Sequence, residues 1–403
     1  MKVIKKLLVG HLLVITVVLT FLSPCIAAEA RNIILMIGDG MGPAQIHVMW
    51  LYSTRYLGRD FAMTEIMNQG KTGYMYNDSL DSSVPESAGA ATQMATGVKV
   101  RAKTIGVGSD GKPLKSILEI AKEKGKTTGL VTTSGITDAT PAAFAAHVMD
   151  RRDEHMIAEQ LVKSDVNVLF GGGRAFFLSE TEKGSKRKDS RNLVEEARKK
   201  GYKVVETANE MKKATGKKML GLFNNDNMLF EIDRFGSNEP SLAEMTVKAL
   251  DVLKSNKDGF FLMVEGGRID NAAHRNDIAA LVFEGIAFDE AVKVAYEFQK
   301  RNTDTLLIIT GDHETGGLAI LSQSPIGRER EGIKREDMST FLSRLSIRSG
   351  WATKSHTATP LFVWGIGPGS EKITGWKHNT ELFKIMRDAY GFLPLFSLIH
   401  SYS

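Results

Sequence analysis

The stretch Asn32-Ile33-Ile34-Leu35-Met36-Ile37-Gly38-Asp39-Gly40 decides the fold class, because five apolar residues follow one another before the glycines end the run. A strand that covers a core with one face alternates polar and apolar side chains, whereas an unbroken apolar run indicates burial on both faces. Similar runs with glycine in or beside them recur at residues 128–132, 166–170, 259–264, 305–310 and 360–364. We predict a buried parallel strand at each of these positions.

Helical patterns lie between these runs, for example at residues 113–124 and 241–254. Alternation of strands and helices is typical of a parallel sheet with helices on both faces. The predicted fold class is therefore α/β, with a large, mostly parallel central sheet in a three-layer α/β/α sandwich. We find no repeat and no proline-rich linker, so we expect residues 29–403 to form a single domain.

Composition and charge exclude several classes of protein. The 403 residues are 42% hydrophobic and 25% charged and include one cysteine, which excludes a disordered chain and a disulfide scaffold. The net charge is +5, and it is +2 without the three lysines of the first six residues, which argues against a dedicated nucleic-acid binder. Residues 180–218 hold 13 Lys or Arg against 7 Asp or Glu. We interpret them as a solvated surface segment with one helix, the alternative being a polyanion site.

The N-terminus has the pattern of a signal peptide. Residues 1–6 are basic, Leu7 to Leu22 are almost entirely apolar, and small residues follow up to Ala28. We predict a signal peptide over residues 1–28, cleaved after Ala28 or Ala30, and hence an exported protein, periplasmic or secreted. A retained membrane anchor and lipidation at Cys25 are the alternatives, although Pro24 departs from the usual lipoprotein pattern.

Metal-binding side chains follow four of the predicted strands. They are Asp39 after the first strand, Asp138 and Thr140 after the second, Glu265 after residues 259–264, and Asp312 with His313 after residues 305–310. In open parallel sheets, ligands bind beyond the carboxyl ends of the strands. Each residue alone could be a helix cap, but the same arrangement at four strand ends favours a binding site.

Asp270 and His274 strengthen this prediction, because residues four apart share one face of a helix. A carboxylate and an imidazole together suit Zn²⁺. The alternative is a surface ion pair, but Glu265 lies just before them, so we favour a metal centre.

The segment Pro85-Glu86-Ser87 looks like the start of a helix. Glu86 or Ser87 could simply be its cap. A serine at a helix N-terminus also lies where free N–H groups and the helix dipole favour anions. No Gly-x-Ser-x-Gly elbow surrounds Ser87, so we expect a metal ion, rather than a histidine triad, to activate its hydroxyl.

Taken together, these residues resemble the alkaline phosphatase family. The similar motifs occur in family order: residues 32–42, Glu86-Ser87-Ala88-Gly89 with 96–99, 137–143 with His147 and Arg151, 264–274, 310–313, and Ser355-His356-Thr357. The resemblance extends from about Arg31 to about Gly369.

The resemblance implies a role for each candidate residue. Ser87 would be the nucleophile, phosphorylated during the cycle, and Arg151 would clamp two phosphate oxygens as a bidentate fork, with Arg152 the less favoured alternative. The metal ligands would be Asp39, Asp312 and His313 for a first Zn²⁺, Asp270, His274 and His356 for a second Zn²⁺, and Asp138, Thr140 and Glu265 for one Mg²⁺, with Asp39 shared between sites.

The function that the resemblance implies is hydrolysis of phosphate monoesters with a broad substrate range. Two Zn²⁺ can stabilise the attacking and leaving oxygens of an in-line displacement. The family also implies a homodimer. Alternatives are another hydrolase or mutase of the same superfamily, such as a phosphodiesterase, a sulfatase or a phosphomutase, or an inactive exported protein that binds metal or phosphate. A sulfatase would carry a Cys/Ser-x-Pro-x-Arg context that Ser87 lacks.

The chain departs from the family pattern in three respects. Glu86 stands where the family usually has Asp, a residue expected to orient Arg151. Asn271 gives a neutral amide at a position that often carries a basic or aromatic side chain. One branch of the family has a calcium site with acids at two positions where this chain has Asn224 and Glu239, so we do not expect that site here.

Overall fold

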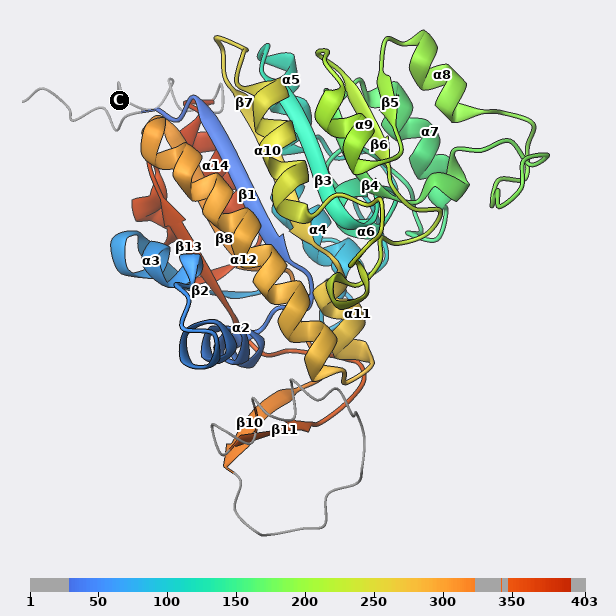
Figure 1. Ribbon diagram of the computed structural model, residues 1–403. Helices are drawn as coiled ribbons and strands as arrows, with labels where there is room; N and C mark the ends of the chain where they lie inside the picture. Colours follow the sequence, from blue (N-terminus) through green and yellow to red (C-terminus); the bar gives the residue numbers. More distant parts are fainter. Residues whose placement is uncertain (1–28, 323–341, 343–346, 393–403) are drawn as a thin grey trace, which may run out of the picture.

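The computed structural model describes residues 29–322, 342 and 347–392, so the predicted signal peptide and Cys25 lie outside the described residues. A sheet of ten strands runs through the molecule (Figure 1). In their order across the sheet, the strands are β14 (Gly375–His378), β2 (Lys71–Tyr76), β13 (Leu361–Ile366), β8 (Thr305–Gly311), β1 (Asn32–Gly38), β7 (Phe260–Gly266), β3 (Thr127–Gly135), β4 (Val168–Gly172), β6 (Met219–Leu222) and β5 (Lys203–Val205). The predicted strand in the stretch that begins at Asn32 thus lies in the middle of the sheet.

The sheet is mostly parallel, as predicted, with one exception. Strand β13 runs antiparallel to both of its neighbours, β8 and β2, so the prediction of a parallel strand at residues 360–364 was wrong. The reason is the route of the chain. The short strand β12 (His356–Thr357) pairs with β9 (Glu314–Thr315) just beyond the carboxyl end of β8, so the chain enters β13 from that edge and must run back.

Helices cover both faces of the sheet, and each face has its own hydrophobic core. Alternate residues of β1 point to opposite sides: Ile34 and Met36 pack in one core, Ile33 and Leu35 in the other. The first face carries α2 (Pro43–Trp50), α3 (Ala62–Gln69), α9 (Ala208–Lys213), α10 (Leu242–Leu253), α11 (Arg268–His274) and α12 (Ile278–Arg301). The second carries α4 (Ser87–Thr96), α5 (Ile117–Glu123), α6 (Ala139–Ala142), α7 (Glu154–Ser164), α8 (Leu193–Lys199) and α14 (Glu381–Ala389).

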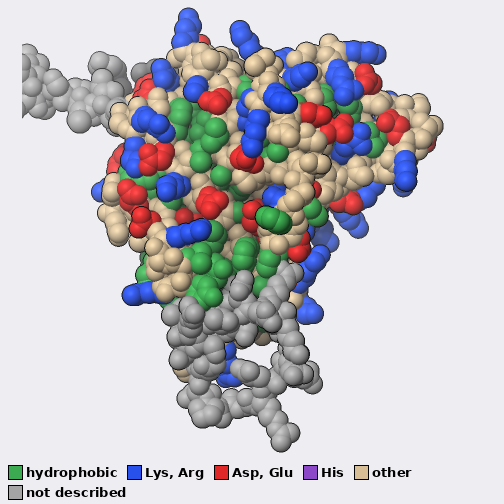
Figure 2. Space-filling view, in the orientation of Figure 1, with side chains coloured by type: hydrophobic (Ala, Val, Ile, Leu, Met, Phe, Trp, Pro, Cys, Tyr) green, Lys and Arg blue, Asp and Glu red, His purple; other side chains and the backbone are tan. Residues whose placement is uncertain are grey.

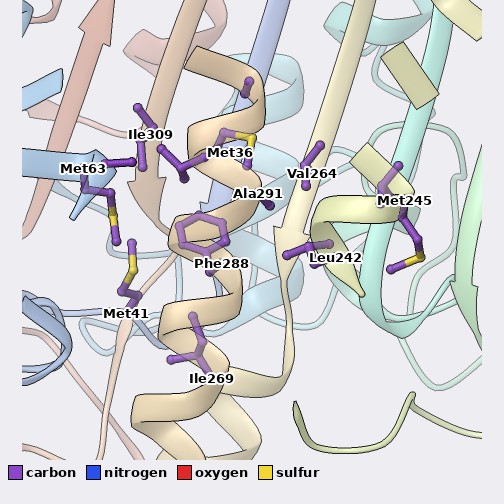
Figure 3. Close-up of a cluster of buried hydrophobic side chains, with 14 of the residues drawn as sticks. Met36, Met41, Met63, Leu242, Met245, Val264, Ile269, Phe288, Ala291 and Ile309 are labelled. Atoms are coloured by element: carbon purple, nitrogen blue, oxygen red, sulfur yellow. The ribbon is translucent and has the colours of Figure 1, made fainter. Parts of the chain in front are cut away.

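Helix α12, of 24 residues, crosses the front of the sheet in Figure 1. In the close-up of the first core, its Phe288 and Ala291 lie near Met36 of β1 and Ile309 of β8 (Figure 3). Beyond the carboxyl ends of the strands, a hairpin of β10 (Leu318–Ser322) and β11 (Ile347–Trp351) projects from the body of the molecule. None of the helices in the described ranges has the length and apolarity that a membrane span requires.

The basic segment 180–218 is more structured than predicted, because it holds two helices, α8 and α9, and the edge strand β5. Helix α9 is short and follows the cap residue Thr207, so its pattern is hard to recognise among the lysines. Several basic side chains of the segment 180–218 pair with carboxylates, for example Lys186 with Asp226 and Arg191 with Glu196. Basic and acidic side chains are also interspersed over the face in Figure 2, which favours the surface interpretation over a polyanion site.

Candidate active site

The candidate residues meet at the carboxyl edge of the central strands. Strand β1 lies between β7 and β8, and Gly38 is in register with Gly266 on one side and Gly311 on the other. The residues at or just after these three strand ends, Asp39, Glu265 and Asp312, are therefore brought into one place. All three are buried.

A first group of possible metal ligands consists of Asp39, Asp312 and His313, whose ligand atoms all lie within 4.8 Å of one another. The Nε2 atom of His313 is 3.4 Å from Oδ1 of Asp39 and 3.3 Å from Oδ2 of Asp312. Those two carboxylate oxygens are buried and have no hydrogen-bond partner among the described residues. Buried charged oxygens without donors need a cation, so this group fits a metal ion.

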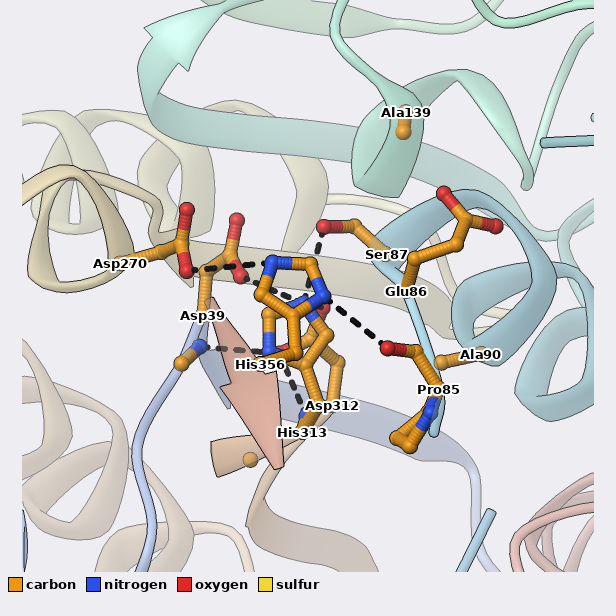
Figure 4. A network of polar contacts seen from close by, with 12 residues as sticks. Asp39, Pro85, Glu86, Ser87, Ala90, Ala139, Asp270, Asp312, His313 and His356 are labelled. Atoms are coloured by element: carbon orange, nitrogen blue, oxygen red, sulfur yellow. Dashed lines mark hydrogen bonds and ion pairs between the residues drawn. The ribbon is translucent and has the colours of Figure 1, made fainter. Parts of the chain in front are cut away.

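A second group of possible ligands consists of Asp270, His313 and His356, so it shares His313 with the first group, and His274 adjoins it (Figure 4). The Nε2 atoms of His274 and His356 are 3.2 and 3.7 Å from carboxylate oxygens of Asp270, and 3.1 Å from each other. The rings of His313 and His356 stack with their centroids 3.7 Å apart, so the two groups adjoin. The structure thus brings together all three residues that the resemblance assigned to a second zinc.

Backbone carbonyls fix which ring nitrogen of these histidines faces the site. Nδ1 of His274 is 2.5 Å from the carbonyl oxygen of Lys354, and Nδ1 of His356 is 2.9 Å from that of Pro85. A carbonyl oxygen only accepts, so each Nδ1 carries the proton and donates it. Nε2 is therefore the nitrogen that faces Asp270, which is the orientation that a metal ligand requires. Without a metal, a proton on Nε2 of His274 joins it to Asp270, and this hydrogen bond raises the pKa of His274.

The third predicted set, Asp138, Thr140 and Glu265, contains only oxygen donors. The Thr140 hydroxyl is buried without a hydrogen-bond partner in the described part of the chain, and Glu265 accepts a hydrogen bond from Thr132 of the neighbouring strand. Burial, and then the nearby charge of Asp138, raise the pKa of Glu265 to about 8. Oxygen ligands of this kind fit Mg²⁺.

The electrostatics of the site follow from burial and from the crowding of acids. Burial, and then repulsion by Asp312, raise the pKa of Asp39 well above its ordinary value, and burial raises that of Asp312 to about 7. Burial also holds the pKa of His313 well below the ordinary value. For Asp270, burial raises the pKa but the hydrogen bond with His274 and the nearby imidazoles lower it overall. The clustered acids are therefore costly to ionise together unless cations balance them.

Ser87 is the first residue of helix α4, and Glu86 caps that helix by accepting hydrogen bonds from the N–H groups of Ala88 (3.0 Å) and Gly89 (2.6 Å). The Ser87 hydroxyl lies 3.1 Å from Nε2 of His313. That nitrogen also faces Asp39 and Asp312, so it is shared with the first ligand group. The serine is thus beside the candidate metal group, at the N-terminal end of a helix.

Arg151 approaches the same helix end from the loop before α7. Its guanidinium donates to Oε2 of Glu86 (3.1 Å) and to Oδ1 of Asp138 (2.7 Å). Oε1 of Glu86 also accepts from the backbone N–H of Lys103 (2.7 Å), so this carboxylate caps the helix and holds the arginine at once. Arg152 instead pairs with Asp150 at the exposed surface.

The other two departures also have distinct surroundings. Oδ1 of Asn271 accepts from Nη1 of Arg268 (2.6 Å) and from Nδ2 of Asn227 (3.2 Å). Glu239 accepts from Nδ2 of Asn224 (2.6 Å) and from the N–H of Leu229 (2.9 Å). Protein donors therefore reach both oxygens of Glu239.

Sequence reasoning missed residues that hold the ligands in place. Thr132 donates to Glu265, and Thr315 donates to Oδ1 of Asp270 at 2.5 Å while its hydroxyl oxygen lies 3.2 Å from Nδ1 of His313. Thr315 stands two positions after His313, and that proximity is the only signal in the sequence. The carbonyl groups of Pro85 and Lys354 leave no signal at all, because every residue has a carbonyl.

Comparison with known proteins gives matches along most of the chain. A family model described as alkaline phosphatase matches residues 30–345. Alkaline phosphatase 4 of Bacillus subtilis is 37% identical over 89% of each chain, and streptomycin-6-phosphate phosphatase of Streptomyces griseus is 33% identical over 90% of this chain and 91% of its own.

Solved structures agree with these matches. The alkaline phosphatase of Thermus thermophilus superposes with a TM-score of 0.81 and 30% identity over 91% of this chain and 92% of its own. A TAB5 alkaline phosphatase in which a histidine is replaced by aspartate, with Mg bound in its M3 site, gives a TM-score of 0.76 and 31% identity over 91% of this chain and 99% of its own.

The α/β sheet with carboxylates and imidazoles at its carboxyl edge, together with these matches, defines the class of the protein as a hydrolase with groups of residues that can bind metal. Within that class, the chain belongs to the alkaline phosphatase family, and its relatives support hydrolysis of phosphate monoesters.

Proposed function

We propose that this chain hydrolyses phosphate monoesters through a phosphoserine formed on Ser87, with two Zn²⁺ and one Mg²⁺ as cofactors. The observation that carries the proposal is the position of the Ser87 hydroxyl, 3.1 Å from Nε2 of His313 at the start of a helix. Asp39, Asp312 and His313 would hold one Zn²⁺, Asp270, His274 and His356 the other, and Asp138, Thr140 and Glu265 the Mg²⁺. When bound, the zinc ions supply Lewis-acid stabilisation of the attacking and leaving oxygens.

The chain's own groups carry the remaining steps. Arg151, held by Glu86 and Asp138, donates to two phosphate oxygens and orients the ester. Oγ of Ser87 bonds to phosphorus as the bond from phosphorus to the alcohol oxygen breaks, and the proton of the Ser87 hydroxyl ends on the released alcohol. Water then attacks phosphorus, the bond to Oγ breaks, and inorganic phosphate leaves with the serine hydroxyl restored. Because Glu86 already accepts from the N–H groups of Ala88 and Gly89, α4 favours the anion through its helix dipole.

The test of this proposal is turnover of chromogenic phosphate monoesters, phosphate diesters and sulfate esters by the purified protein, with and without added Zn²⁺. We expect zinc-dependent hydrolysis of monoesters with varied alcohols and little hydrolysis of the other two classes. Preference for diesters or sulfates would favour another activity of the superfamily. No turnover with zinc bound would favour an inactive binding protein.

The third metal site gives a separate prediction. Zinc-loaded protein stripped of magnesium should gain several-fold in turnover as Mg²⁺ is added, because the all-oxygen set prefers this hard cation. Glu265→Gln should lose the response while still binding two Zn²⁺, since Glu265 is outside both zinc sets. Metal content measured beside steady-state rates checks this. A wild-type protein that ignores Mg²⁺ with its third site verified empty would contradict it.

Glu86 should matter for both the helix and the substrate. In Glu86→Ala, loss of its contact with Arg151 should raise KM for a monoester and the inhibition constant of phosphate roughly tenfold, as expected for one charge-assisted hydrogen bond. Loss of the cap should lower the free energy of unfolding by about 1 kcal/mol. Thr207→Ala, which removes the cap of α9, is the control for stability alone. Unchanged KM in Glu86→Ala would remove Glu86 from the phosphate clamp.

Three wider proposals follow from the sequence and the family. Residues 29–403 would form a single catalytic domain. One sheet supports this proposal, because its strands come from segments between Asn32 and His378. The protein would be exported through its leader to the periplasm or the medium. It would act as a homodimer on varied small phosphate monoesters, without specific binding of nucleic acid.

A further inference from the structure

Glu314 is a buried carboxylate between His313 and Thr315 that belongs to none of the proposed metal sets. Its Oε1 accepts from Nε2 of Gln45 (2.5 Å) and from the N–H of Leu318 (3.2 Å). Its Oε2 accepts from the N–H of Gly317 (3.1 Å) and from the hydroxyl of Thr357. Two donors on each oxygen leave the carboxylate no room for a metal ion, so its role is to bind other parts of the chain.

The contact with Thr357 joins the two chain segments that carry His313 and His356. Strands β9 and β12 pair antiparallel, with Glu314 opposite Thr357 and Thr315 opposite His356. This pair of strands, called the β9–β12 ribbon below, therefore has His313 just before β9 and His356 in β12, and the rings of the two histidines stack. The Thr357 hydroxyl donates to Glu314, so a side-chain hydrogen bond joins the two strands next to these histidines.

The contact with Gln45 ties the same ribbon to helix α2. The fully buried Nε2 of Gln45 donates both to Glu314 and to the carbonyl oxygen of Thr315 (2.8 Å). The N-terminus of α2 packs so closely that a Cβ at Gly42 would lie 2.2 Å from Cγ of Glu314. The Glu314 carboxylate thus contacts both helix α2 and the β9–β12 ribbon.

We infer that Glu314 is a positioning residue that sets the separation of His313 and His356, and through them the spacing of the two Zn²⁺ sites. This inference rests on the proposed function, because it presupposes zinc at these histidines. It assigns to Glu314 a defined effect on metal binding rather than a general effect on folding.

The test is direct titration of metal-free protein with Zn²⁺ against a competing chelator, which needs no turnover. Glu314→Gln puts an amide NH₂ against a backbone N–H whichever way it turns, so Zn²⁺ should bind roughly 10- to 100-fold more weakly, as expected for a partner of metal ligands. Thr357→Val, which removes one contact, should weaken binding about tenfold, whereas Thr357→Ser keeps the hydroxyl and should remain near wild type. If Glu314→Gln does not fold, the two Thr357 variants decide.

Asp289 provides the matched control. It is also a buried carboxylate that accepts two backbone N–H bonds, from Ala62 and Met63, but it lies on α12 outside the site. Asp289→Asn should lower thermal stability and leave Zn²⁺ affinity unchanged. Wild-type affinity in both Glu314→Gln and Thr357→Val, or an equal loss in Asp289→Asn, would overturn the inference alone. Failure of the unaltered protein to bind Zn²⁺ would overturn the proposed function with it.

Discussion

Replacement of Ser87 by alanine is expected to lower turnover of phosphate monoesters by roughly 10³-fold or more, since it removes the nucleophile of the proposed covalent cycle. The fold and the zinc content should persist, because Ser87 belongs to none of the ligand sets, and in the described part of the chain its hydroxyl forms a hydrogen bond with His313 alone. Steady-state kinetics and metal analysis of the same preparation measure the two effects.

A second serine at a helix start separates chemistry from capping. Ser241 caps α10 by accepting from the N–H of Glu244, and it lies outside the site. Ser241→Ala should cost about 1 kcal/mol of stability and leave turnover intact.

Phosphate should be trapped on Ser87 of the wild-type protein at low pH. A Ser87→Ala protein that works at nearly the wild-type rate, with no phosphate found on Ser87, would rule out the assignment.

Most of what is predictable here comes from strand ends. Apolar runs with glycine in or beside them locate β1, β3, β4, β7 and β8, and polar residues that follow parallel strands must meet at one edge. This reasoning places Asp39, Glu265 and Asp312 together before any coordinate is known. It does not give the order of the strands, which depends on how helices pack on the two faces.

Other parts of the site depend on contacts that no local pattern encodes. The direction of β13 follows from the pairing of β9 with β12, a contact between residues about 40 positions apart. The orientation of His274 and His356 depends on two backbone carbonyls. Glu314 carries no motif of its own in the sequence, and its role emerges only when Gln45 and Thr357 arrive from distant segments.

Removal of all metal ions by a chelator is expected to lower turnover by roughly 10³-fold or more, because Lewis-acid stabilisation supplies several kcal/mol. Turnover should return when Zn²⁺ and Mg²⁺ are added back.

The metal-free protein should also differ from the metal-loaded protein in how its stability depends on pH. Its buried acids then have raised pKa values, about 7 for Asp312 and about 8 for Glu265.

The sign of this effect follows from proton binding. An unfolded chain releases the protons of Asp and Glu near pH 4, whereas the folded metal-free protein retains those of Asp312 and Glu265 up to about pH 7 to 8. The folded state therefore binds more protons in this range, and its free energy of unfolding falls as pH rises, by at most about 1.4 kcal/mol per group and pH unit. His313 and His356, whose pKa values are lowered by burial, act oppositely but only below about pH 6.5.

In thermal unfolding between pH 7 and 8.5, His313 and His356 are neutral in either state and do not contribute. His274, whose pKa is raised by its hydrogen bond with Asp270, adds to the acids with the same sign in the metal-free protein. The metal-free protein should lose stability over this range, and the metal-loaded protein should lose less, since bound cations keep the carboxylates ionised. Buried Glu284 and Asp289, with pKa values raised to about 7, contribute equally to both forms and cancel in the difference. Metal-free Glu265→Gln should show a shallower slope than the metal-free wild type. Equal slopes in the metal-free and metal-loaded proteins would mean that these carboxylates do not face a bound cation.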